Sequence, residues 1–229
     1  MGVFMIPSFF IGGNYMLENI IHLIYPKVCG ICEEISKEDI CNKCKVKIKQ
    51  WQRNKKHIYL TKYFTTHMYV FDYRDIIRQK ILQYKFSEKA YIFRSFVKII
   101  LNDKKICGFL KNYDIIIPVP ISKKRKRLRG YNQSELIAKM IAKQAKTIEC
   151  RCDILYKQKD TLPQSSLDKE KRQQNIKNAY YIKNEKTVQN KKILLLDDIY
   201  TTGSTTNECS KMLKQVGAKE IGVLTLAKD

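Results

Sequence analysis

Acidic residues are scarce in this chain of 229 residues, in which 22 Asp and Glu stand against 44 Lys and Arg. The resulting net charge of +22 favours a polyanionic partner, such as a nucleic acid, a nucleotide or a phosphosugar. A bias of composition is an alternative cause, because the chain is also rich in Ile, Asn and Tyr, as AT-rich coding would produce. Such a bias would raise Glu as well, so it explains only part of the excess.

Long apolar runs are also missing. No run reaches the roughly 18 residues that a transmembrane helix needs, so we expect no membrane span. Residues 1–13, MGVFMIPSFFIGG, look superficially like a signal sequence, but they lack a basic n-region and a small-residue cleavage site. We therefore expect a cytoplasmic protein, in which residues 1–15 are disordered or are an artefactual extension before a true start at Met16.

The order of apolar segments predicts the fold class. Short apolar runs at 113–121 and 191–199 indicate buried strands, and amphipathic segments at 134–146 and 205–218 indicate helices. Strands that alternate with helices predict an α/β fold with a parallel sheet covered on both faces. We expect an N-terminal module with a linker at 16–68 and one α/β domain at 69–229.

Half of the eight cysteines cluster near the N-terminus in the pattern C-x2-C-x8-C-x2-C, formed by Cys29, Cys32, Cys41 and Cys44. Each C-x2-C can direct two thiolates at one ion, which predicts a four-cysteine zinc site. Four protein ligands leave no open position for a reacting water, so the expected role of the zinc is structural. The alternative is a pair of redox dithiols, but those usually sit on a thioredoxin-like βαβ unit, and none is apparent here.

A second motif lies in the stretch LLLDDIYTTGST, directly after its apolar residues. Asp197 and Asp198 come at the end of the expected strand, the edge at which open α/β sheets bind ligands. A helix that begins near Thr205 or Thr206 would then offer unpaired N–H groups to an anion. We therefore expect a phosphosugar, with its phosphate in the loop and its diol on the carboxylates, and Mg²⁺ held nearby. A helix cap without a ligand is the alternative.

DDIYTTGST resembles the PRPP-binding signature of type I phosphoribosyltransferases, where PRPP is 5-phosphoribosyl 1-pyrophosphate. Three further segments resemble the ComF family (ComFC/GntX-like), in the order in which that family has them. They are PKVCGIC…CNKC, PVPISKKRKRLRGYNQSELIAKMI and TLPQSSLDKEKRQQNIKNAYYI. The resemblance covers nearly the whole chain from about residue 16. It implies a type I phosphoribosyltransferase fold and a link to natural competence and DNA uptake.

The same resemblance implies the roles of individual residues. Asp197 and Asp198 would bind the ribose hydroxyls of PRPP, and the loop that starts at Ile121 and Ser122 would take the pyrophosphate with Mg²⁺. The residues implied to hold the 5′-phosphate are Thr201, Thr202, Gly203, Ser204 and Thr205.

Two residues are implied to act in catalysis. Arg172 falls in the segment that resembles the flexible lid, and Lys85 matches a lysine of the family's "KF" segment. A solvated charge on a helix face is the equally weighted alternative for Lys85. No dedicated general base is apparent, and the acceptor could be a base, an amine or nothing.

A second function class is open beside the enzyme: a competence factor that binds single-stranded DNA and uses PRPP or a nucleotide only as a ligand. We expect a basic loop beside the site to contact the DNA, with Tyr131 available to stack on a base. Competence proteins are further possible partners. The loop residues expected to contact DNA are Lys123, Lys124, Arg125, Arg127 and Arg129.

Overall fold

The computed structural model of the protein describes residues 27–58, 63–87, 89–159 and 178–229. The extension expected at 1–15 lies outside the described residues. Among the residues that are described, no helix combines the length and the apolar character needed to cross a membrane.

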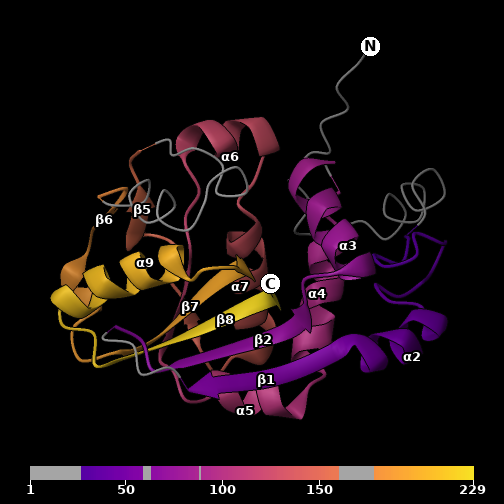
Figure 1. Ribbon diagram of the computed structural model, residues 1–229, viewed down its shortest axis with the longest axis horizontal. Coiled ribbons are helices and arrows are strands. Elements are labelled where there is room, and N and C mark those ends of the chain that lie inside the picture. The colour runs from indigo at the N-terminus through magenta and orange to yellow at the C-terminus, as the bar shows by residue number, and fades with distance from the viewer. Residues whose placement is uncertain (1–26, 59–62, 88, 160–177) are drawn as a thin grey trace, which may run out of the picture.

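A six-stranded sheet forms the centre of the fold, with the strand order β1-β2-β8-β7-β3-β4 (Figure 1). The pairs β2–β8, β8–β7, β7–β3 and β3–β4 are parallel, and β1 pairs antiparallel with β2 at one edge. The prediction of a parallel sheet is therefore confirmed. The strands are β1 (Gln52–Ile58), β2 (Thr66–Asp72), β3 (Ile115–Pro118), β4 (Glu149–Cys150), β7 (Lys192–Tyr200) and β8 (Glu220–Lys228); β5 (Leu155–Lys157) and β6 (Tyr180–Ile182) form a separate hairpin.

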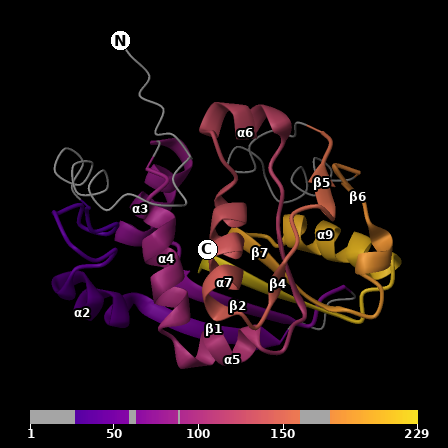
Figure 2. The ribbon, with the colours of Figure 1, turned by 180° about the vertical axis from the view of Figure 1, so that it is seen from behind.

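Helices cover both faces of this sheet. Helix α9 lies on one face, and α4, α5 and α7 lie on the other, as the two opposite views show (Figures 1 and 2). The helices are α2 (Asn42–Trp51), α3 (Asp75–Phe86), α4 (Ile92–Leu101), α5 (Lys104–Leu110), α6 (Lys123–Arg129), α7 (Gln133–Ala145) and α9 (Ser204–Gln215), with a short 3-10 helix η2 (Glu185–Thr187).

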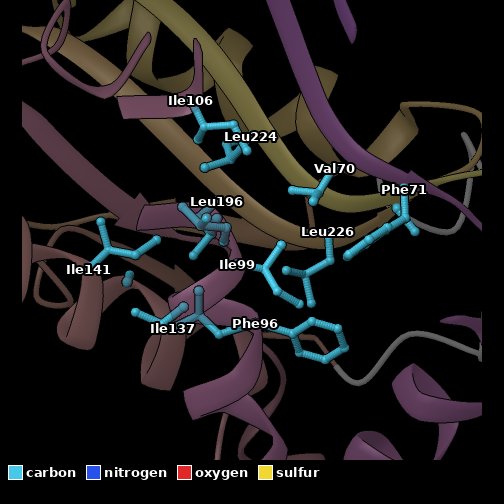
Figure 3. Close-up of a cluster of buried hydrophobic side chains, with 14 of the residues drawn as sticks. Val70, Phe71, Phe96, Ile99, Ile106, Ile137, Ile141, Leu196, Leu224 and Leu226 are labelled. Carbon is cyan, nitrogen blue, oxygen red and sulfur yellow. The ribbon is translucent and has the colours of Figure 1, made fainter. Parts of the chain in front are cut away.

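The alternation of side chains along β7 explains why the sheet needs two helical layers. Leu194 and Leu196 join the core beneath α4, α5 and α7, part of which Figure 3 shows, whereas Ile193 and Leu195 join the core beneath α9. All four side chains are fully buried. Burying each such side chain stabilises the fold by about 1.5–3 kcal/mol, so both layers contribute.

The cysteine-rich segment is fixed to helices α3 and α4 by polar contacts. Glu33, the residue after Cys32, pairs at 2.5 Å with Lys80 of α3, whose side chain is only 4% exposed. A second lysine, Lys89, also pairs with Glu33. At Gly30 a Cβ atom would lie 2.3 Å from the Ser95 hydroxyl of α4, so this close approach requires glycine. The cysteine-rich segment is therefore packed directly on the helices of the α/β fold.

Candidate functional site at the carboxyl edge of the sheet

The loops that follow β3 and β7 lie side by side. Pro118 pairs with Leu196 in the parallel ladder, and the amide of Val119 donates to the carbonyl of Leu196 at 2.9 Å. Both strands therefore end at the same edge of the sheet, the edge where ligands bind in folds of this class. This register brings the segment at 119–122 next to the two aspartates.

Asp197 and Asp198 lie within β7, because the strand continues to Tyr200, which pairs with Lys228 of β8. The strand expected at 191–199 is therefore present with its bounds shifted by one residue, and the aspartates lie in its last part. Both are half-buried, and the amide of Asp198 donates to Oδ1 of Asp197 at 2.9 Å. Burial and the neighbouring charge of Asp198 raise the pKa of Asp197 to about 7. The pair is thus a concentrated negative charge that needs cations around it.

Lys85 supplies one of those cations. Its Nζ atom lies 2.9 Å from Oδ2 of Asp198, and the two side chains are 16% and 15% exposed. Lys85 is therefore a shielded partner of the aspartates, and the alternative of a solvated helix-face charge is wrong. It stands in the last turn of α3, so this helix carries a positive charge into the site.

Arg129 approaches the same carboxylate from another element, the end of α6. Its Nη1 donates to Oε1 of Gln133 at 3.2 Å, and its guanidinium lies 4.7 Å from the centre of the Phe86 ring. Burial lowers the pKa of Arg129, and the charge of Asp198 opposes that shift. Asp198 is thus paired directly with Lys85 and also acts on the charge of Arg129.

The loop after β7 is built to receive an anion at a helix N-terminus. Helix α9 begins at Ser204, one or two residues before the expected start, and Gly203 precedes it with a φ of 73° that favours glycine. The hydroxyls of Thr202 and Ser204 lie 2.8 Å apart, and that of Thr206 donates to the carbonyl of Gly203 at 3.0 Å. Hydroxyls and the first amides of α9 therefore gather around one turn, as expected for a phosphate site.

The predicted pyrophosphate loop is braced by its neighbours. The side-chain amide of Asn132 donates to the carbonyl of Val119 at 3.1 Å, which ties this loop to the start of α7. Ile121 is half-buried in it. Ser122 is 3% exposed, and its hydroxyl accepts from the amide of Arg125 at 3.3 Å, which caps α6. The Ser122 side chain therefore already has a structural role.

The expectation of a basic loop is wrong, because the segment forms helix α6. The cap by Ser122 and a left-handed Gly130 with a φ of 78° define its two ends. Lys123, Lys124 and Arg127 are exposed, whereas Arg125 and Arg129 are half-buried. A cap at each end offsets the mutual repulsion of these charges.

The expectation that Tyr131 is available to stack on a base is also wrong. Its ring is stacked on Tyr84 with centres 5.5 Å apart, and its hydroxyl donates to the carbonyl of Tyr84 at 2.5 Å. The hydroxyl of Tyr84 in turn donates to the carbonyl of Gln133 at 2.9 Å. Tyr131 therefore joins α3 to α7. The exposed aromatic residue at this site is Phe86, which the sequence analysis did not single out.

The four clustered cysteines come together as their spacing predicts. The sulfur atoms of Cys29, Cys32, Cys41 and Cys44 all lie within 4.8 Å of one another, so they could hold a metal ion. Four sulfurs at 2.3 Å from one tetrahedral ion would be about 3.8 Å apart. The Cys32 and Cys41 sulfurs are 3.7 Å apart, and the amide of Cys41 donates to the Cys29 sulfur at 3.3 Å. The donor set and its geometry fit such an ion.

Arg172, the other residue implied to act in catalysis, lies outside the described residues.

Comparison with known proteins gives one matching family model and three similar proteins, which differ in how much of the chain they cover. A family model described as "Phosphoribosyl transferase domain" matches residues 132–229, which include the aspartates and the loop. The chain is 36% identical over 154 residues to "Competence protein F" of Haemophilus influenzae, which covers 65% of this chain and 66% of that protein. It is 27% identical over 223 residues to "DNA utilization protein YhgH" of Escherichia coli O6:H1, covering 88% of this chain and 90% of that one. It is 29% identical over 163 residues to "Competence protein ComFC" of Streptococcus pneumoniae, with 71% and 68% covered.

The raised pKa of Asp197 predicts a pH-dependent stability. The folded state holds this proton more tightly than the unfolded chain, so the resulting stability is full at acidic pH and is lost as the pH rises toward about 7. Asp197→Asn removes the buried charge. We therefore compare the two free energies of unfolding. The value for Asp197→Asn minus the value for wild type should increase by about 2 kcal/mol from about pH 5 to about pH 8. Urea unfolding at both pH values measures this, and a difference that does not change with pH would contradict the assignment.

Proposed function

This chain belongs to the ComF family and carries a phosphoribosyltransferase domain. From this we propose that it binds PRPP and that this binding has a role in DNA uptake. One observation carries the proposal: Asp197 and Asp198 lie half-buried beside the loop that turns into α9. Carboxylates repel phosphate and accept hydrogen bonds from hydroxyls, so the two halves of the site suit the two halves of a phosphosugar. A site for phosphate alone would gain nothing from the paired acids.

Each residue of the site then has a separate task. The turn at 201–205 would hold the 5′-phosphate through amides and hydroxyls, and the aspartates would hold the ribose diol. The segment at 121–122 would lie along the pyrophosphate. Mg²⁺ would be held by the carboxylates directly or through water, and when bound it offsets the charge of the pyrophosphate.

The described residues favour phosphoribosyl transfer from this site through electrostatics. Loss of pyrophosphate from the ribose leaves positive charge on the sugar and negative charge on the leaving group. The paired carboxylates face the sugar, while Lys85 and Arg129 place positive charge beside them. Groups that are fixed before the reaction stabilise such a charge separation without having to reorganise.

The charge of the aspartates provides the test. Changing both Asp197 and Asp198 to Asn keeps the shape of the site and removes the charged acceptors, each of which is worth about 1.5–3 kcal/mol in a hydrogen bond. The affinity for PRPP with Mg²⁺ should therefore fall at least about ten-fold in a calorimetric titration. Equal affinities for two folded proteins would reject the proposal.

Two smaller ligands separate the parts of the site. Ribose 5-phosphate keeps the diol and should also lose affinity in the double variant. Inorganic phosphate should bind as well or better, because two repelling charges are gone. A change of Gly203 to Ala should instead weaken phosphate binding, since the new Cβ would lie 2.3 Å from the Tyr200 hydroxyl and distort the turn.

We propose that the metal of the cysteine cluster is Zn²⁺ and that its role is structural. Four thiolate donors, with no further ligand side chain among the described residues, are typical of closed zinc sites. Gly30 and Glu33 lie between or beside these ligands and contact α4 and α3, so the ion would fix a segment that packs on the main domain.

Loss of one ligand tests the zinc assignment. Wild type should carry about one zinc per chain in metal analysis, and Cys41→Ser should lower that content and the thermal stability. Cys107→Ser is the matched control, because Cys107 lies on α5 outside the cluster and should retain the metal. An unchanged zinc content in Cys41→Ser would remove the four-thiolate site.

Binding of single-stranded DNA is a second candidate function, and the observation that favours it is the exposure of cations on α6. Lys123, Lys124 and Arg127 are exposed on this helix, which begins directly after the proposed pyrophosphate segment. Three similar proteins are named for competence or DNA utilization. A single-stranded DNA that binds along α6 would therefore pass close to the proposed phosphosugar site.

Salt dependence tests this function. The triple change of Lys124, Arg125 and Arg127 to Ala should weaken binding of an oligodeoxythymidylate and flatten the plot of log affinity against log salt by roughly two units. A control variant changes Lys104, Lys105 and Lys111, which are exposed on or next to α5, at the other end of the molecule from α6 (Figure 1). If the triple variant and this control behave alike, α6 is not the DNA contact.

A further inference from the structure

An exposed aromatic side chain, Phe86, contacts Arg129 at the candidate site. It is the last residue of α3 and is 67% exposed. Single exposed apolar residues are common on proteins and carry little meaning alone. Phe86 differs because it directly follows Lys85, whose ammonium group is bound to Asp198 at 2.9 Å. Phe86 therefore stands at the end of a helix whose preceding residue is bound to an aspartate of the site.

Arg129 fixes the ring from the opposite element. Its guanidinium carbon lies 4.7 Å from the ring centre, and the same guanidinium donates to Gln133 at 3.2 Å. A cation over an aromatic face is an attractive contact, and it leaves much of the Phe86 surface open. Lys85, which precedes Phe86 in the chain, and Arg129, which contacts its ring, both act on Asp198.

The neighbouring aromatic residues have different environments. Tyr84 is fully buried, and Tyr131 is stacked on Tyr84 with its hydroxyl bound to a carbonyl. Both are used to join α3 to α7. In the described part of the chain, the ring contact of Phe86 is with the Arg129 guanidinium. Its ring adds little to the core, which points to a ligand.

Helix α6 indicates the chemistry of that ligand. The helix that ends at Arg129 presents exposed Lys123, Lys124 and Arg127, and its Leu128 is 77% exposed. Cations that can contact phosphates next to an aromatic face that can contact a base form the combination used to bind single strands. A duplex would keep its bases stacked inside and offer none to Phe86.

We propose that Phe86 is the platform on which a nucleobase of a single-stranded polynucleotide stacks, while α6 holds the neighbouring phosphates. The proposal rests on the proposed DNA function and deepens it, because it places one base of the strand beside the proposed pentose site. The Arg129 guanidinium sets the orientation of the platform, and the Lys85–Asp198 ion pair sets its position.

The experiment compares two probes that share the same phosphates. One is an oligodeoxythymidylate, and the other is an abasic oligomer of equal length. Wild type should bind the base-bearing strand about five-fold to a hundred-fold more tightly, since stacking on one aromatic side chain is worth that much. Phe86→Ala and Phe86→Leu should both lose this preference, whereas Phe86→Trp should keep it. The salt slope should stay unchanged in all three variants.

Further measurements separate this proposal from the functions on which it rests. Ile35→Ala is the control, because Ile35 is 76% exposed and lies in the N-terminal module, and this change should leave both affinities unchanged. PRPP affinity should be the same in Phe86→Ala as in wild type, which shows that the phosphosugar site is intact. Equal binding of both probes by wild type would overturn the proposal. An equal loss of affinity for both probes in Phe86→Ala would overturn it as well.

Discussion

The ion pair between Lys85 and Asp198 is the interaction on which the rest of the site depends. Asp197 and Asp198 are adjacent carboxylates near the end of a largely buried strand, where burial and the charge of Asp198 together raise the pKa of Asp197. Because Lys85 approaches from α3 and Arg129 from the end of α6, the two helices are drawn to the carboxyl edge of the sheet. The resulting arrangement places acids and cations together at the edge of the sheet where the sugar is proposed to bind.

Helix α3 also joins the two parts of the chain. Lys80 in its middle pairs with Glu33 beside the cysteine cluster, and Lys85 at its end pairs with Asp198. An unpaired charge at the nearly buried Lys80 would be costly, so the helix has a strong preference for one position along its axis. The cysteine-rich segment therefore helps to place a residue of the site. This connection gives a physical reason for one chain to carry both parts.

The strain at this edge has the character of a functional site. A buried acid with a raised pKa destabilises the fold at neutral pH, and a left-handed glycine against the Tyr200 ring leaves no room for a side chain. Proteins keep such features where binding needs them and recover the stability elsewhere. Here the recovery comes from the fully buried apolar residues of β7 and β8, which pack on both faces of the sheet immediately before the aspartates.

Local chemistry let the sequence determine much of this protein. The continuous apolar run of β7, the glycine before α9 and the two C-x2-C pairs each follow from residues close together in the chain, and the structure has all three. Tertiary packing decided the rest. A run of like charges indicated a loop, but caps at Ser122 and Gly130 made it a helix. Tyr131 looked free until Tyr84 covered it, and Lys85 had two equal interpretations until α3 brought it to Asp198. Which cation meets which carboxylate, and which aromatic ring stays open, depends on how distant helices pack, and no short stretch of sequence carries that information.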